Sequence, residues 1–143
     1  MGIKKSKYFK IHELVPEKLY ESVHEDLLWS MIDSRLITVI DKLKEKFNHG
    51  TMTINNYYWN GDRKWSGIRT KDSKYYSDGS QHSIGNAVDI IFSNYNASDI
   101  REYILENQDE FPGIGGVEDF DGMGWVHIDT RDRRNSKIIV FGS

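Results

Sequence analysis

The chain has 143 residues, of which 38% are hydrophobic and 29% are charged, so it has the length and composition of one folded domain. The formal net charge of −3 argues against a dedicated nucleic-acid binder, which would normally carry a basic surplus. There is no cysteine, which excludes disulfides, thiolate metal ligands and a cysteine nucleophile.

The first 50 residues are expected to form a helical segment that packs on the rest of a single domain spanning 1–143. Pro16 predicts a helix start, because proline is favoured in the first turn of a helix. Apolar residues recur at three- and four-residue spacing over 25–48, which predicts one amphipathic helix there. These apolar positions are Leu28, Met31, Ile32, Leu36, Val39, Ile40, Leu43 and Phe47.

The middle of the chain predicts two strands and a long loop between them. Residues 51–59 are β-branched and aromatic, which is typical of a strand. The polar stretch 60–81 contains several glycines and predicts a long loop, and long loops in compact domains are usually functional. Residues 86–92, with the sequence NAVDIIF, are expected to form a short buried strand.

The last third predicts a helix followed by three strands. Ser98 or Asp99 is expected to cap a helix that runs to about residue 107. The predicted strands are 113–118 and 124–129, joined as a hairpin, and 137–141. Because strands and helices do not alternate along the chain, we expect an α+β fold with a small, mostly antiparallel sheet flanked by helices.

Two of the five histidines lie in a different context from the others. His12, His24 and His49 have polar or helix-end neighbours and are expected to be ordinary surface residues. His82 precedes the predicted strand NAVDIIF, and His127 lies in the middle of the predicted strand GWVHID. An imidazole between apolar strand residues needs a polar partner, so these two histidines are the candidates for a site.

Asp89 is a carboxylate inside an apolar strand, where burial is costly unless the group is paired, hydrogen-bonded or bound to a metal. One interpretation is a polar pair in the core, with Asp89 bridged to a basic residue and His127 hydrogen-bonded. The other is a metal site formed by His82, Asp89 and His127. Three protein ligands and one open position are typical of catalytic zinc, and nitrogen and oxygen donors suit that ion. Spacing alone leaves both interpretations open.

Three linked segments resemble the group of zinc D-alanyl-D-alanine carboxypeptidases and phage endolysin peptidases, whose fold is shared with the hedgehog signalling domain. The segments are SGIR at 66–69, SQHSIGNAVD at 80–89 and WVHID at 125–129. The match covers roughly residues 51–130 and leaves the first 50 residues unexplained. The resemblance implies a hedgehog/DD-peptidase-like fold and a zinc ion held by His82, Asp89 and His127.

The resemblance also implies roles for residues outside the ligand set. Arg69 would bind a substrate carboxylate or stabilise an oxyanion, which suits a guanidinium group, although it could also be an ordinary arginine in a polar loop. Ser80 and Trp125 would contact the substrate.

A general base is needed beside the metal, since the proton of the attacking water must reach the leaving amine. Several branches of the group place an acidic residue three positions before the final histidine, where this chain has Gly124. Glu118, at the end of a predicted strand, is the favoured base. Asp121 lies six positions before that histidine, a spacing found in the hedgehog-like branch. Asp129 would act as a further acid or would orient a neighbouring group from behind.

Aromatic residues surround the Arg69 loop and could line a groove for an extended peptide or a glycan. Core packing is the favoured interpretation for Tyr57 and Trp59, which lie in the predicted strand. The members of this aromatic group are Tyr57, Tyr58, Trp59, Trp65, Tyr75 and Tyr76.

The expected function is zinc-dependent hydrolysis of an amide bond in peptidoglycan stem peptides, as a D,D-carboxypeptidase or an L,D-endopeptidase. The chain shows neither a secretory signal nor a membrane span. We therefore expect a protein made in the cytoplasm that reaches the wall through a holin or as a virion component. The alternatives are a non-catalytic phage structural or wall-binding module that keeps the metal fold, and a hydrolase that acts on another amide.

Overall fold

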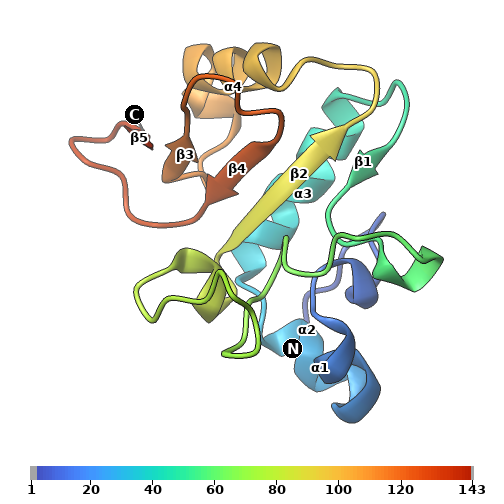
Figure 1. The fold of residues 1–143 in the computed structure, drawn as a ribbon. Coiled ribbons are helices and arrows are strands. Elements are labelled where there is room, and N and C mark those ends of the chain that lie inside the picture. The colour runs from blue at the N-terminus through green and yellow to red at the C-terminus, as the bar shows by residue number, and fades with distance from the viewer. Residues whose placement is uncertain (1–2, 143) are drawn as a thin grey trace.

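A five-stranded mixed sheet forms the middle of the fold in the computed structural model, which describes residues 3–142 (Figure 1). The strands lie in the order β1–β2–β4–β3–β5. Neighbouring strands are antiparallel except β3 and β5, which run parallel. The strands are Met52–Thr53 (β1), Ala87–Phe92 (β2), Gly116–Glu118 (β3), Val126–Asp129 (β4) and Ile139–Phe141 (β5). The α+β class is confirmed, as is the hairpin formed by β3 and β4.

Four α-helices accompany the sheet, and three of them precede the first strand (Figure 1). The α-helices are Glu17–Ser22 (α1), Glu25–Ser30 (α2), Ser34–Lys46 (α3) and Ala97–Glu106 (α4). Single 3₁₀ turns are formed by Ile11–Glu13 (η1), Tyr57–Trp59 (η2), Gln81–Ile84 (η3) and Gln108–Glu110 (η4). Within residues 3–142, no helix is long and apolar enough to cross a membrane.

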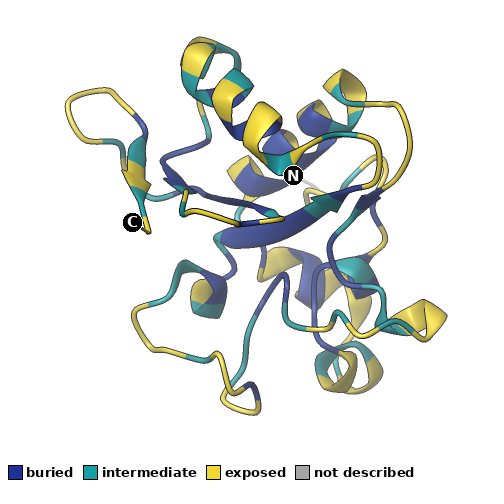
Figure 2. Ribbon diagram, turned by 45° about the horizontal axis from the view of Figure 1, so that its top comes forward, coloured by how far each residue is buried: buried dark blue, intermediate teal, exposed yellow. Residues whose placement is uncertain are grey.

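The central strands separate a core face from a polar face. Side chains alternate along a strand, so every second residue of β2, β3 and β4 points into the core. The core residues of these strands are Val88, Ile90, Val117, Val126 and Ile128, each at most 1% exposed. On the core face, α3 crosses behind β2 (Figure 1). Figure 2 shows β2 and β4 in the colour of buried residues, and all of their residues except Ile91 are buried, so little of either face of these strands meets bulk solvent.

The prediction of a single helix over 25–48 is wrong, because the chain breaks it between Met31 and Asp33 into α2 and α3. The Asp33 carboxylate accepts a hydrogen bond from the backbone N–H of Arg35 at 2.9 Å and caps α3. The backbone N–H of Asp33 donates to the carbonyl of Gly85 at 3.0 Å. Both helices bury their apolar residues in the same core, so the apolar spacing continues across the break.

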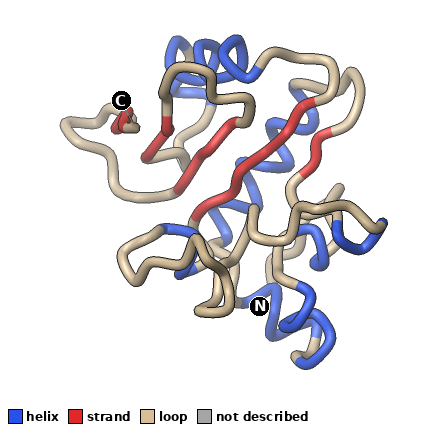
Figure 3. Tube along the Cα trace, viewed as in Figure 1, coloured by secondary structure: helices blue, strands red, loops and turns tan. Residues whose placement is uncertain are grey.

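The strand predicted over 51–59 is wrong for most of its length, since only Met52–Thr53 pairs with β2 (Figure 3). The buried side chain of Asn55 donates to the carbonyl of Val15 at 3.1 Å and accepts from the backbone N–H of Ser66 at 2.9 Å. Asparagine side chains that bond to backbone groups in this way compete with a strand ladder. The chain therefore leaves the sheet after β1 and turns into η2.

The remaining predicted elements are present, with one correction at a helix start. The strands predicted at 86–92 and 137–141 are confirmed as β2 and β5, and the helix ending near residue 107 is confirmed as α4. The N-cap of α4 is Asn96 rather than Ser98 or Asp99. Asp99 instead lies in the first turn, where its carboxylate accepts from the side chain of Asn96 at 3.3 Å.

Candidate metal centre

Three neighbouring strands place an aspartate, a histidine and a glutamate in one row on the polar face of the sheet. Asp89 of β2 is opposite His127 of β4, which is in turn opposite Glu118 of β3. Directly opposed side chains of antiparallel strands lie close enough to interact. The row continues to Phe141 of β5, whose ring centroid lies 5.6 Å from that of His127.

His82 reaches this row from η3, just before the start of β2. The hydroxyl of Ser80 accepts a hydrogen bond from the backbone N–H of His82 at 3.2 Å and caps the turn. Gly85 ends the turn with a φ of 77°, in the left-handed region that glycine adopts without steric cost. A Cβ at Gly85 would lie 2.0 Å from the carbonyl oxygen of Met31, so glycine also permits this close approach. Both ends of η3 are thereby held, and the His82 ring faces Asp89.

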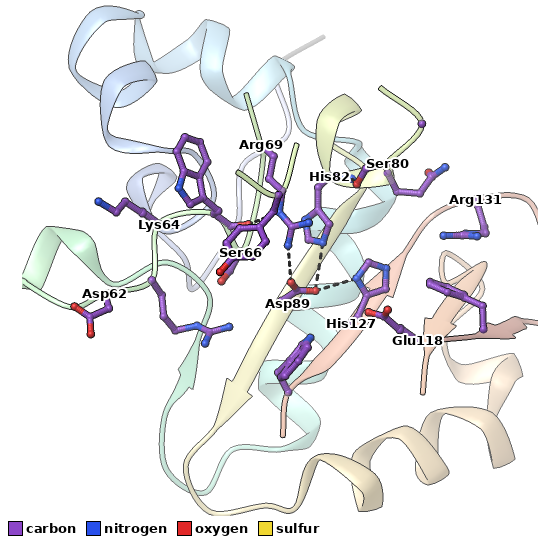
Figure 4. Close-up of a pocket in the computed structure, with 17 residues that line it drawn as sticks. Asp62, Lys64, Ser66, Arg69, Ser80, His82, Asp89, Glu118, His127 and Arg131 are labelled. Carbon is purple, nitrogen blue, oxygen red and sulfur yellow. Dashed lines mark hydrogen bonds and ion pairs between the residues drawn. The ribbon is translucent and has the colours of Figure 1, made fainter. Parts of the chain in front are cut away.

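His82, Asp89 and His127 form a buried group that could hold a metal ion, with one donor atom from each residue within 4.8 Å of the other two. Oδ1 of Asp89 lies 3.3 Å from Nε2 of His82 and 2.9 Å from Nδ1 of His127 (Figure 4). The three residues are between 3% and 8% exposed. Their donor atoms therefore converge on one point at which little bulk water can compete.

The outer nitrogen of each imidazole is held by a group that can only accept. Nδ1 of His82 lies 2.9 Å from the carbonyl oxygen of Gly67, and Nε2 of His127 lies 3.0 Å from a carboxylate oxygen of Asp129. Such partners keep a proton on the outer nitrogen, so the inner nitrogen of a neutral ring turns its lone pair toward Asp89. Partners of this kind orient histidines that bind metals. The residues present therefore fit a metal ion.

Asp129 is itself held in place by Arg131. The guanidinium of Arg131 donates from Nε at 2.8 Å and from Nη2 at 2.7 Å to the two oxygens of this carboxylate, which is fully buried. Gly116, opposite Asp129 on β3, leaves room for the pair. A Cβ at Gly116 would lie 2.5 Å from Oδ1 of Asp129 and 2.6 Å from Nε of Arg131. Arg131 thus holds the carboxylate of Asp129, and that carboxylate holds the ring of His127.

Arg69 holds the other oxygen of Asp89. Its Nη2 donates to Oδ2 of Asp89 at 2.9 Å, and its Nε donates to the carbonyl of Trp65 at 2.8 Å. The guanidinium also lies over the ring of Tyr75, 5.6 Å from the centroid. These contacts make Arg69 a positioning residue for Asp89. They use its Nε and Nη2 groups, which the sequence led us to expect at a substrate carboxylate or an oxyanion.

The charges in this group shift the pKa values of its members in opposite directions. Burial would lower the pKa of His127, but hydrogen bonds with Asp129 and Asp89 outweigh burial and raise it from 6.5 to about 9. Burial would raise the pKa of Asp89, but hydrogen bonds with His127 and His82 bring it well below its usual range. In the metal-free protein His127 is therefore a cation between two carboxylates, and a metal ion must displace its inner proton.

The group lies in the wall of a pocket of about 630 Å³ (Figure 4). Glu118, Ser80 and Trp125 line this pocket, as does Arg69. The pocket is rich in charge. Its acidic lining residues are Asp62, Asp89 and Glu118, and its basic lining residues are Arg63, Lys64, Arg69 and Arg131. Arg69 is paired with Asp89 and Arg131 with Asp129, so the pocket as a whole offers charged groups of both signs.

Two carboxylates considered as catalytic acids lie outside the pocket lining. Asp121 is exposed in the turn between β3 and β4. Asp129 is buried behind His127, where it orients the ring. Glu118 is the predicted acid that lies both in the pocket and in the row with His127.

Two residues of interest were missed from the sequence. Arg131 lies two positions after Asp129, and in extended chain that spacing puts two side chains on the same side, so its pairing with Asp129 could have been predicted. The prediction that His12 is a surface residue is wrong, since it is 7% exposed and its ring stacks on Tyr58. No feature of its sequence neighbours indicates that burial.

No family model, no curated protein and no solved structure matches this chain. Its function is therefore inferred from the residues and the geometry of the site.

Proposed function

We propose that the chain is a zinc-dependent peptidase that hydrolyses an amide bond in peptidoglycan stem peptides, with a fold related to that of the hedgehog domain and the DD-peptidases. The observation that carries this proposal is the convergence of His82, Asp89 and His127 at the wall of a charged pocket, with the outer nitrogen of each imidazole fixed. A chain of this kind would act on the bacterial wall after release through a holin, or from within a virion.

Zinc is the metal that this donor set suits best. With metal–ligand distances of about 2.0–2.2 Å and tetrahedral angles, the donor atoms of a zinc site lie about 3.3 Å apart. The separations of 3.3 Å and 2.9 Å from Oδ1 of Asp89 to the two ring nitrogens are close to that value. Two imidazoles and one carboxylate leave a fourth position open for water or substrate, which is the arrangement of catalytic rather than structural zinc.

The chain's own residues would carry the proton and orient the substrate. A bound zinc ion would supply a water of lowered pKa and would polarise the scissile carbonyl. Glu118 lines the pocket opposite His127, which supports it as the group that would take a proton from the attacking water and return it to the leaving amine. Trp125 would supply an apolar wall beside the peptide.

Arg69 would act mainly through Asp89. Its Nη2 contact holds the carboxylate so that Oδ1 stays directed at the two imidazoles. An arginine has five N–H donors, so the donors that remain after its bonds to Asp89 and Trp65 could still meet a developing oxyanion. Arg63 and Lys64, which also line the pocket, would receive the carboxylates of a stem peptide.

The test is metal content together with wall digestion. Purified protein should carry about one zinc per chain and release fragments from purified peptidoglycan, and mass analysis of those fragments would identify the bond. His82→Ala should lose both zinc and digestion, whereas His24→Ala, at an exposed histidine, should keep both. Digestion that persists in His82→Ala or in excess chelator would rule out the proposal.

One observation favours the alternative of a non-catalytic wall-binding module. Position 124, where several relatives would have the acid, is a glycine, and no atom lies within 4 Å of a Cβ built there. A module of this kind would bind zinc and wall but would release no fragments. The same digestion assay distinguishes the two, because wall binding without turnover by the wild-type chain supports the module.

A further inference from the structure

A second pocket, of about 660 Å³, lies between the N-terminal helical segment and η2, outside the metal centre. Its volume falls within the range of about 300–1,000 Å³ that is typical of small-molecule sites. Four of its lining residues have aromatic rings: His12, Tyr20, Tyr58 and Trp59. Lys10 and Glu25 add one positive and one negative charge to its lining.

Two of these rings, Tyr58 and Trp59, are largely exposed and lie nearly perpendicular to each other. The ring of Tyr58 stacks on that of His12, with centroids 4.0 Å apart and an interplanar angle of 10°. Trp59 is inclined by 83° to Tyr58 and by 78° to His12. Tyr58 is 54% exposed and Trp59 is 60% exposed. His12 thus covers one face of the Tyr58 ring. The exposed rings of Tyr58 and Trp59, which meet at 83°, form what we call the aromatic corner.

The His12 ring that stacks on Tyr58 carries a polar atom without a partner. The residue is 7% exposed, and its buried Nδ1 has no hydrogen-bond partner among the described residues. Buried polar atoms without a partner are rare in folded proteins. Burial, together with the nearby charge of Lys10, lowers the pKa of His12, so an uncharged ring supports Tyr58 at physiological pH.

One closed loop connects this pocket to the metal centre. Asn56 and Arg63 close it, because the backbone N–H of Asn56 donates to the carbonyl of Arg63 at 2.9 Å and the backbone N–H of Arg63 donates to the Asn56 side chain at 2.8 Å. Tyr58 and Trp59, near one end of the loop, line the aromatic pocket, whereas Asp62–Lys64 at the other end line the metal pocket. Figure 4 places Asp62 and Lys64 across the Asp89–His127 pair from Arg131. Residues of the same loop thus line both pockets.

We propose that the aromatic pocket binds a sugar ring of the wall glycan, an N-acetylhexosamine, and so holds the strand to which the stem peptide is attached. A pyranose ring has an apolar C–H face that suits an exposed indole or phenol ring, and its hydroxyl and acetamido groups suit Lys10 and Glu25. One positive and one negative lining group match an uncharged ligand. This inference rests on the proposed function, because it names the polymer that carries the scissile peptide.

The test is calorimetric titration of the full chain with chitotetraose, an oligomer of N-acetylglucosamine that carries no peptide. We expect saturable binding that weakens about tenfold or more in Trp59→Ala, which removes the exposed indole ring. Tyr75→Ala is the matched control, because Tyr75 is 56% exposed but lies beside Arg69 in the other pocket. Its affinity for the sugar should equal that of the wild type.

The same titration with His82→Ala separates this inference from the proposed function. Sugar binding that survives in this variant while the wild type fails to digest wall would support the glycan site and rule out the peptidase. Digestion of wall without any binding of chitotetraose would rule out the glycan site alone. Equal binding by wild type and Trp59→Ala would also rule it out. Self-association of the wild type that Trp59→Ala abolishes, without sugar binding, would instead assign this surface to a second copy of the chain.

Discussion

The carboxylate of Asp129 lies 3.0 Å from Nε2 of His127, on the side of the ring opposite to Asp89. His127 is therefore held between two carboxylates, only one of which belongs to the group that could hold a metal. The outer carboxylate is fully buried and is bound in two places by Arg131. His127 would bind the metal, whereas Asp129 orients the His127 ring. Metal binding and ring orientation can therefore be tested separately, by substitution of one residue at a time.

Asp129→Asn should weaken zinc binding about 10- to 100-fold without removing a ligand, because an amide orients and polarises His127 less strongly than a carboxylate does. Competition with a chromophoric chelator measures the affinity. Asp132→Asn, at an exposed aspartate three positions away, is the control and should bind zinc as the wild type does. An unchanged affinity in Asp129→Asn would show that the bond between Asp129 and His127 does not support the metal.

Glu118→Gln should lower the turnover number by about 10²- to 10⁴-fold and leave zinc content unchanged, since Glu118 lines the pocket but does not belong to the donor group. Asp121→Asn should keep wild-type turnover, because Asp121 is exposed in a turn outside the pocket lining. Both variants are assayed on purified peptidoglycan, with metal content measured in parallel. The assignment of the base fails if turnover drops in Asp121→Asn and not in Glu118→Gln.

The metal-free protein should become less stable as the pH rises from about 6.5 to 9. The pKa of His127 is raised in the folded state from 6.5 to about 9, so its contribution is complete below pH 6.5 and is lost as the pH rises through 9. The loss should reach ~3 kcal/mol in the free energy of unfolding. Denaturant titration in chelator at pH 6 and pH 9 measures this change. His127→Gln should remove most of the difference, whereas a difference that persists in this variant would assign it to other groups.

Zinc should reverse this pH dependence. Binding requires that His127 give up its inner proton, so affinity should rise with pH up to about 9 and binding at pH 7 should release a proton. Calorimetry in two buffers of different ionisation enthalpy counts the protons released. Binding with no proton release at pH 7 would show that His127 is already neutral in the metal-free protein.

Gly116→Ala should destabilise the fold by ~1–3 kcal/mol and weaken zinc binding, because the new Cβ would displace the Asp129 carboxylate and the Arg131 guanidinium. Gly124→Ala is the matched control in the same hairpin, where a Cβ meets no atom within 4 Å. Thermal unfolding of both variants gives the comparison. Equal melting temperatures would show that the Asp129 pair can move aside at no cost.

Much of the group that could hold a metal could be predicted because its residues break a pattern. Asp89 and His127 stand out as polar residues in apolar strands, and the alternation of side chains in such strands is a strong constraint. The closeness of His82 was predicted from the resemblance and not from spacing, since it depends on the turn η3. The contact between Arg69 and Asp89 joins a loop to a strand 20 residues away, and no local pattern predicts it.

Three of the errors come from side-chain contacts that periodicity and propensity do not report: a helix cap, a bond to distant backbone and a ring stack. Asp33 caps α3 and breaks a helix whose apolar spacing is continuous. Asn55 bonds to Val15 and Ser66 and ends a strand whose composition favours extension. The burial of His12 depends on the position of Tyr58, more than 40 residues later in the chain. Side-chain bonds and packing between distant segments are absent from periodicity and propensity.

Strand β4 buries Val126 and Ile128 in the core and presents His127 and Asp129 on the other face of the sheet. A slip of β4 by one residue against its neighbours would put an imidazole and a carboxylate into the apolar core and expose two aliphatic side chains. The structure with the shifted register would therefore have a much higher free energy than the native one. The hydrophobic core thus fixes the pairing of β2 with β4, and with it the alignment of Asp89 and His127, whereas the position of His82 depends on the turn η3.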